Sequence, residues 1–342
     1  MGASPLNNDL RRGGDSVSHV VILDGTLSSL EPLCQTNAAR TYMLLQEVGA
    51  PLSLYYEPGL QWTDWRSALH VTTGRGINRQ IRRAYGYLAA RYRPGDRIFL
   101  FGYSRGAYAV RSLAGVIDLV GLLRPDRATV GGIAAAYHYY ESNTESAAAA
   151  AFRTDHCHPD VQIEMIGVWD TVKSLGINAP ILWRWTEHLH AFHNHDLGAH
   201  IRNGFHALAY DETRVAFSPV LWRCDGGHDG RVEQVWFPGA HGDVGGQLGG
   251  FEAARPLSNI PLVWMLERAE QSGLILPKGW QDRYPRDPLA PARGTWRGHG
   301  RMLMSRKRRI IGEDPSEEIH PSVTLRYATR AKKKGKAEAL QP

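Results

Sequence analysis

The sequence is poor in cysteine and has no long hydrophobic run. Its 342 residues include only three cysteines, whose odd number and wide spacing match neither a disulfide framework nor a zinc site. No apolar stretch approaches the ~18 residues that a membrane-spanning helix needs. The basic residues near the N-terminus are not followed by the hydrophobic segment of a secretory signal. These absences predict free thiols at Cys34, Cys157 and Cys224 and a cytoplasmic location by default.

The chain also has no net charge outside its C-terminal segment. The formal net charge is +6, but basic and acidic residues balance over positions 1–300, so the whole excess lies in positions 301–342. A neutral body argues against a nucleic-acid-binding face, and no nucleic acid is expected as a partner. The lysines after position 331 are interpreted as a solvated basic tail, with a docking site for anionic lipid or nucleic acid as the less favoured alternative.

The residues that are abundant indicate a globular protein with many turns. Hydrophobic residues make up 43% and charged residues 22% of the chain, enough for one large core or two modest ones. Glycine and proline together account for about one residue in six without any repeat period. This composition favours many turns around a large sheet.

Apolar runs that are typical of buried strands alternate with helical patterns along the chain. The expected strands are 19–23, 52–56, 97–101, 161–169 and 232–237, and helical patterns cover about 37–48, 77–92 and 105–122. A parallel crossover needs a connection of helix size, so this alternation favours parallel strands with helices on both faces. The sequence therefore predicts an α/β fold, a doubly wound and mostly parallel sheet.

One domain is expected, over residues 19–326. A flexible N-terminal segment, 1–18, precedes it and the basic tail, 327–342, follows it. Two stretches near 124–155 and 181–200 break the alternation and are expected to be helical insertions above the sheet.

The segment from Gly102 to Gly106 fits the pattern G-x-S-x-G, with Ser104 at its centre. An apolar strand precedes it and a helix follows, which is the context of a nucleophile elbow. The glycines are needed because side chains two residues before and after the strained serine would meet neighbouring backbone. The amide of Arg105, at the start of the following helix, is positioned to hold an oxyanion. An ordinary strand-to-helix turn with a capping serine is the alternative.

A serine nucleophile needs a histidine base and an acid that orients the histidine. In α/β-hydrolases the order along the chain is Ser, Asp or Glu, then His. Asp170 and His241 follow two expected strands in that order. Asp243 is a rival acid, but it lies two positions from His241 and is expected to brace the loop or tune the site; His320 is a rival base.

A second oxyanion donor is expected in the loop after the first strand. Gly25 and Thr26 are the candidates, because glycine lets backbone amides approach a substrate carbonyl closely. Asp24 gives this loop some likeness to aspartate-nucleophile phosphatases. Their nucleophile would fall at Ile22, which carries no carboxylate, so that interpretation fails.

Five ordered blocks together resemble the DUF2235 α/β-hydrolase family, which includes the catalytic domain of Tle1-type phospholipase effectors of bacterial type VI secretion. The blocks are 23–26, 102–115, 167–172, 206–214 and 235–246. The resemblance implies an α/β-hydrolase-like fold in which Ser104 is the nucleophile, with Asp170 and His241 beside it. It implies a lipid substrate, and transient contact with a membrane surface follows as a candidate interaction. Secretion by a signal-independent route and a cognate immunity protein are further candidates, but the resemblance does not by itself carry secretion over to this chain.

These observations predict a serine hydrolase that cleaves carboxylic esters, of phospholipids or other lipids, through an acyl-enzyme and without a cofactor or metal. A catalytically silent α/β-hydrolase scaffold with a binding or regulatory role is the alternative from another class. A metal-dependent hydrolase that uses Asp24, Asp170, His241 and Asp243 is a third hypothesis.

Overall fold

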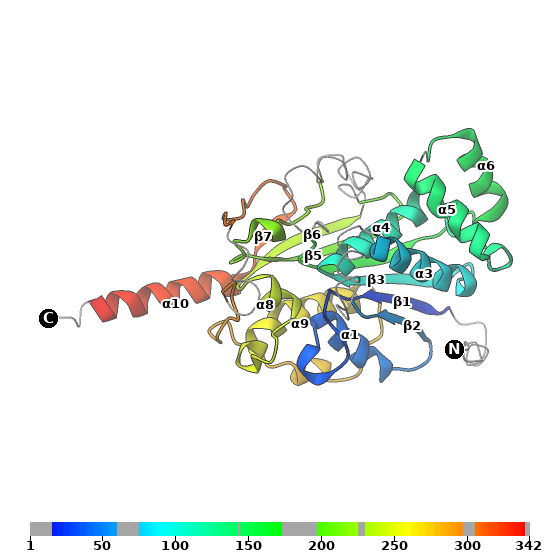
Figure 1. Ribbon diagram of the computed structural model, residues 1–342. Coiled ribbons are helices and arrows are strands. Elements are labelled where there is room, and N and C mark those ends of the chain that lie inside the picture. Colours follow the sequence, from blue (N-terminus) through cyan, green and yellow to red (C-terminus); the bar gives the residue numbers. More distant parts are fainter. Residues whose placement is uncertain are drawn as a thin grey trace.

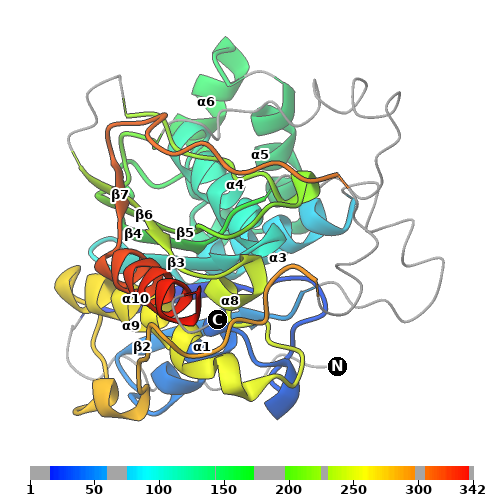
Figure 2. The same ribbon diagram turned by 90° about the vertical axis from the view of Figure 1, so that its left-hand side faces the viewer.

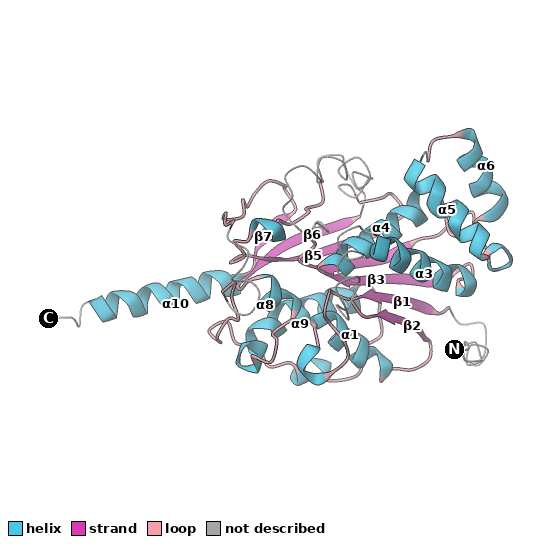
Figure 3. Cartoon of the chain, viewed as in Figure 1, coloured by secondary structure: helices cyan, strands magenta, loops and turns pink. Residues whose placement is uncertain are grey.

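A parallel sheet of seven strands forms the centre of the described part of the protein. The computed structural model describes residues 16–59, 75–142, 144–172, 197–224, 230–296 and 305–338. Within these ranges the strands are β1 (Ser18–Leu23), β2 (Leu52–Glu57), β3 (Arg97–Tyr103), β4 (Ile163–Trp169), β5 (Asn203–Ala209), β6 (Arg231–Phe237) and β7 (Glu317–Ile319). Their order is β2-β1-β3-β4-β5-β6-β7, and every neighbouring pair is parallel (Figure 3). The carboxyl ends of all these strands therefore meet at one edge.

Helices cover both faces of the sheet. They are α1 (Asn37–Gln46), α3 (Arg75–Arg91), α4 (Arg105–Leu119), α5 (Val130–Ser142), α6 (Ala147–His156), α8 (His241–Gly245), α9 (Arg255–Gln271) and α10 (Pro321–Glu338). Helices α3, α4 and α5 lie on one face, and α1, α8 and α9 lie on the other (Figures 1 and 2). Helix α10 starts just after β7 and projects away from the body (Figure 1).

Strand β1 shows why apolar runs predict strands in this protein. Successive side chains of a strand point to opposite faces of the sheet. Val21 and Leu23 pack with residues of α3 and α4 in one core, whereas Val20 and Ile22 pack with residues of α1 and α9 in the other. All four are fully buried, because a parallel sheet covered on both faces has no solvated side.

The predicted fold class is confirmed, and β1, β2, β3, β4 and β6 lie at or within a few residues of the expected strands. Strands β5 and β7 and helix α9 were not predicted. Strand β5 has the sequence NGFHALA, which lacks β-branched residues, and β7 has only three residues. Helix α9 contains Pro261 and is buried on nearly all sides, so it carries neither an uninterrupted helical sequence nor a polar face.

The regions outside the sheet agree only in part with expectation. The stretch 124–155 is helical, since it contains α5 and α6. Positions 173–196, with most of the second expected insertion, and positions 1–15 lie outside the described residues. The segment expected as a basic tail begins inside α10. Among the described helices, none has the length and hydropathy needed to cross a membrane.

Candidate functional site

Ser104 lies at a sharp turn between β3 and α4. Its φ is 58° and its ψ is −118°, a conformation that is strained for a residue with a side chain. A Cβ atom at Gly106 would collide with the carbonyl oxygen of Leu23, and one at Gly102 would lie 2.6 Å from the carbonyl oxygen of Gly106. Both glycines therefore permit the close backbone approach that the turn requires.

The structure brings Ser104, His241 and Asp170 together at the carboxyl edge of the sheet. Nε2 of His241 lies 2.9 Å from Oγ of Ser104, and Nδ1 lies 2.6 Å from Oδ2 of Asp170. An ionised carboxylate only accepts hydrogen bonds, so Nδ1 of the imidazole donates to Asp170. Nε2 is then the acceptor for the Ser104 hydroxyl, which is the arrangement that a general base needs.

Asp170 follows β4 and is completely buried. Its Oδ1 accepts a hydrogen bond from the Ala209 N–H at 2.9 Å. The guanidinium of Arg309 contacts both carboxylate oxygens, with Nη1 2.5 Å from Oδ1 and Nη2 2.9 Å from Oδ2. Burial opposes ionisation of this carboxyl, but Arg309 and His241 outweigh it and hold the pKa of Asp170 well below its usual value.

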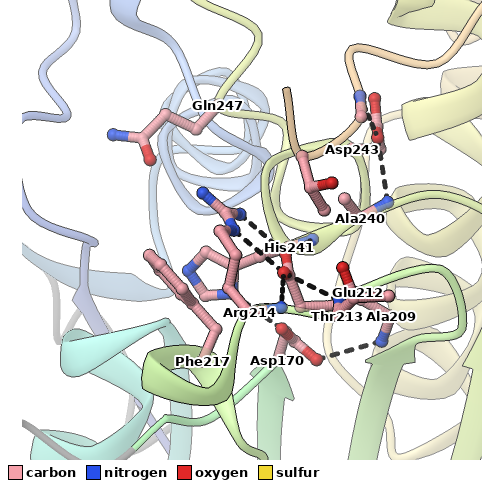
Figure 4. Close-up of polar contacts among 12 residues, drawn as sticks. Asp170, Ala209, Glu212, Thr213, Arg214, Phe217, Ala240, His241, Asp243 and Gln247 are labelled. Carbon is pink, nitrogen blue, oxygen red and sulfur yellow. Dashed lines mark hydrogen bonds and ion pairs between the residues drawn. The ribbon is translucent and has the colours of Figure 1, made fainter. Parts of the chain in front are cut away.

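His241 is the first residue of α8 and is almost fully buried. Its ring lies 4.9 Å from the ring of Tyr103 and 4.6 Å from that of Phe217, measured between centroids. Its backbone N–H donates to Oε2 of Glu212 (Figure 4). Burial lowers the pKa of His241 below 6.5 despite the neighbouring Asp170, so the imidazole is neutral and basic at neutral pH.

Glu212 and Arg214 form a buried ion pair beside His241 (Figure 4). Nη2 of Arg214 lies 2.6 Å from Oε2 of Glu212, and the Arg214 guanidinium lies over the ring of Phe217, 4.0 Å from its centroid. Glu212 thus holds the backbone of His241, and Arg214 packs on Phe217, whose ring contacts the imidazole. Sequence reasoning placed both residues in a motif block and gave them no role.

The predicted oxyanion donors are only partly available. Arg105 is the first residue of α4, so its N–H has no acceptor within the helix. The N–H of Gly25, in contrast, donates to Oδ1 of Asp24 at 2.6 Å, which corrects the expectation that it faces a substrate oxygen. The carbonyl of Thr26 accepts from Nε2 of Gln247 at 2.7 Å, and this bond ties the loop after β1 to the loop after α8. The Thr26 amide stays a candidate donor.

Two carboxylates that the sequence marked as supporting residues hold the loops around the site. Asp24 is buried and accepts from the hydroxyls of Thr36 and Tyr56, and burial raises its pKa to about 6. Asp243 accepts from the backbone N–H groups of Ala240, Arg293 and Gly294. Each of these carboxylates is therefore engaged by hydroxyl or backbone N–H donors of its own surrounding loops. Over the described ranges, no three His, Cys, Asp or Glu side chains lie together as a metal-binding group.

His320, the rival base, has other partners. Its Nδ1 lies 2.7 Å from Oγ of Ser322, and its ring stacks on Phe237 with 4.7 Å between centroids. Burial lowers its pKa to about 4. His241 occupies the position beside Ser104, so the structure places His320 in the packing between β7 and α10.

Arg309 is a residue at this site that lies outside every motif block of the sequence. It lies in a run of basic residues, 306–309, before β7. Nothing in that run distinguishes the one side chain that is 5% exposed and paired to Asp170. Arg309 and Asp170 are 139 positions apart in the sequence, so only the folded structure reveals their contact.

The protein is α/β-hydrolase-like: it has a parallel sheet covered by helices on both faces, and a sharp strand-to-helix turn at the carboxyl edge of that sheet carries Ser104. A family model described as "T6SS, Phospholipase effector Tle1-like, catalytic domain" matches residues 18–268, and the chain belongs to this family.

Other comparisons identify relatives of lower similarity. An uncharacterized protein of Saccharomyces cerevisiae, YEL023C, is 27% identical over an alignment of 230 residues, and the match covers 59% of this chain and 32% of that protein. The chain thus spans about a third of the length of this relative.

Two solved structures match this chain at low similarity. An uncharacterized protein from Pseudomonas aeruginosa has 16% identity and a TM-score of 0.42, over 78% of this chain and 47% of that chain. The Tle1 effector bound to the VgrG spike of the type VI secretion system has 18% identity and a TM-score of 0.35, over 72% and 55% of the two chains.

Proposed function

We propose that this protein is a serine hydrolase that cleaves carboxylic esters of phospholipids or other lipids. The hydrogen-bonded chain from Ser104 through His241 to Asp170 carries the proposal. Membership of a family described as phospholipase effectors supports a lipid as the substrate. A lipid substrate entails transient contact with a membrane surface, and the effector family suggests a cognate immunity protein as a partner.

The reaction begins when Nε2 of His241 takes the proton of the Ser104 hydroxyl and Oγ attacks the ester carbonyl. The N–H groups of Arg105 and Thr26 hold the oxyanion, aided by the N-terminus of α4. His241 then protonates the leaving alcohol, and an acyl-enzyme remains on Ser104. Water, activated by the same imidazole, releases the fatty acid and restores the serine.

The test is a hydrolysis screen of short-chain esters, long-chain esters and phospholipids with the native protein and Ser104→Ala in parallel. We expect turnover of at least one class, and a loss of roughly 10⁴- to 10⁶-fold in Ser104→Ala. Far-ultraviolet circular dichroism and the thermal midpoint check that the variant folds. Full activity of Ser104→Ala would refute the proposal.

Covalent labelling separates the proposal from the catalytically silent scaffold. A fluorophosphonate probe should modify Ser104 of the native protein and leave His241→Ala unlabelled. Native, folded protein that takes up no probe and hydrolyses no ester would favour the scaffold. Loss of activity with a chelator, restored by a divalent metal, would favour the metal-dependent alternative.

A further inference from the structure

The acid partner of His241 is also the partner of a buried arginine. Nη1 and Nη2 of Arg309 each contact one oxygen of the Asp170 carboxylate, at 2.5 and 2.9 Å. The side chain of Arg309 is 5% exposed and that of Asp170 is fully buried. Bidentate guanidinium–carboxylate pairs are directional as well as strong, and burial limits their screening by salt.

Arg309 also connects Asp170 to two elements around the imidazole. Nη1 donates to the carbonyl oxygen of Ala209 at the end of β5, at 3.0 Å. Nη2 donates to the carbonyl oxygen of Phe217, whose ring packs against His241. One guanidinium therefore fixes the carboxylate, the strand end and the turn that carries an aromatic wall of the site.

The charge of Arg309 bears on the base strength of His241. The charge of the acid partner normally stabilises the imidazolium that forms when histidine takes the serine proton. A guanidinium on the same carboxylate offsets part of that charge, and a weaker net negative charge beside the imidazole disfavours its protonation. The imidazole thus stays neutral, and competent as a base, to lower pH.

The other charged and titratable groups around His241 leave this balance in place. They are Tyr103 and Ser104 from the end of β3, Asp170 after β4, Glu212 and Arg214 after β5, and Asp243 on α8 itself. Glu212 and Arg214 pair with each other, so their opposite charges largely cancel at the ring. Loss of the Arg309 charge would leave Asp170 uncompensated beside the imidazole.

We propose that Arg309 is a positioning residue that holds Asp170 against His241 and extends the hydrolase activity to more acidic pH. The inference rests on the proposed function, since it assigns Arg309 a role in the same site. The geometry of the Arg309 guanidinium accounts for the position of Asp170, and its charge accounts for the pH range.

The experiment compares the pH dependence of native protein, Arg309→Gln and Arg308→Gln. Arg308→Gln is the matched control, because it removes the same charge from an exposed side chain one position earlier. The readout is the rate of fluorophosphonate labelling of Ser104 between pH 4 and pH 8 in one buffer series. We expect the acidic limb of the Arg309→Gln profile to move to higher pH by about one unit, whereas Arg308→Gln follows the native profile.

Arg309→Lys separates charge from geometry and serves if Arg309→Gln does not fold. Lysine retains the charge and lacks the planar fork, so we expect an acidic limb close to native and a maximal rate severalfold lower. The inference would be overturned if the acidic limb of the Arg309→Gln profile coincided with the native limb. If Arg309→Gln does not fold, an Arg309→Lys protein with the native labelling rate and the native pH profile would overturn it instead. Native protein that is not labelled at any pH would instead refute the proposed function.

Discussion

Oγ of Ser104 lies 2.9 Å from Nε2 of His241, although 137 positions separate the two residues. The turn after β3 and the turn after β6 carry them, and β4 and β5 lie between these strands in the sheet. A parallel sheet places every strand end at one edge, and its twist curves that edge. The pairing therefore depends on the sheet as a whole.

Asp170→Asn should lower kcat/KM for ester hydrolysis by about 10⁴-fold, because an amide at this position favours the wrong imidazole tautomer. Steady-state kinetics at pH 7.5 would measure the loss. Asp118→Asn is the matched control, since Asp118 forms another Asp–His pair, 2.7 Å from Nδ1 of His200. Equal losses in the two variants would argue against a role for Asp170 in the site.

His320→Gln should leave ester hydrolysis near the native rate, because its imidazole contacts Ser322 and Phe237 instead of Ser104. His241→Gln should lower it on the order of 10⁴-fold or more. Both rates are measured per mole of folded protein, since His320 contributes to packing. If His320→Gln loses activity and His241→Gln keeps it, the assignment of the base is reversed.

Gly106→Ala should lower the free energy of unfolding by about 3 kcal/mol, because the added methyl group would overlap backbone of Leu23 and Asp24. Urea denaturation gives the difference. Gly131→Ala is the control: this glycine is exposed in α5, and an added Cβ would meet only Oγ1 of Thr129, at 4.0 Å. A Gly106→Ala protein as stable as Gly131→Ala would show that the turn relaxes around the methyl group.

Asp24 should make stability depend on pH with an unusual sign for a carboxyl group. Burial raises the pKa of Asp24 from 3.8 to about 6, so the folded protein retains this proton to higher pH than the unfolded chain. The contribution to stability is present below pH 3.8 and is lost as pH rises to about 6.

Asp24→Asn removes this titration. The variant also loses stability because its hydrogen bonds change, but that loss is the same at every pH. Relative to native protein, the variant should gain about 2 kcal/mol in free energy of unfolding between pH 4 and pH 7. Urea denaturation across that range measures the difference, with Asp160→Asn as an exposed control. A native-minus-variant difference that does not change with pH would contradict the prediction.

Local sequence was informative where one segment contains the whole structural reason. The apolar run before Ser104, the glycines on each side and the helical pattern after it are all within about 25 residues, and they predicted the strand, turn and helix. Strand β5 was missed because its burial comes from β4 and β6 on either side in the sheet and from α8 and α9 on one face, none of which is visible in NGFHALA.

The sequence by itself determined the alternation of strands and helices, the strained turn at Ser104 and a short set of candidate partners for it. The tertiary structure alone decided that His241 rather than His320 faces that serine, that the Gly25 amide is held by Asp24, and that Arg309 pairs with Asp170. The physical reason is range: backbone sterics and hydrophobic periodicity act over a few residues, whereas hydrogen bonds and ion pairs depend on where distant segments meet when the sheet is assembled.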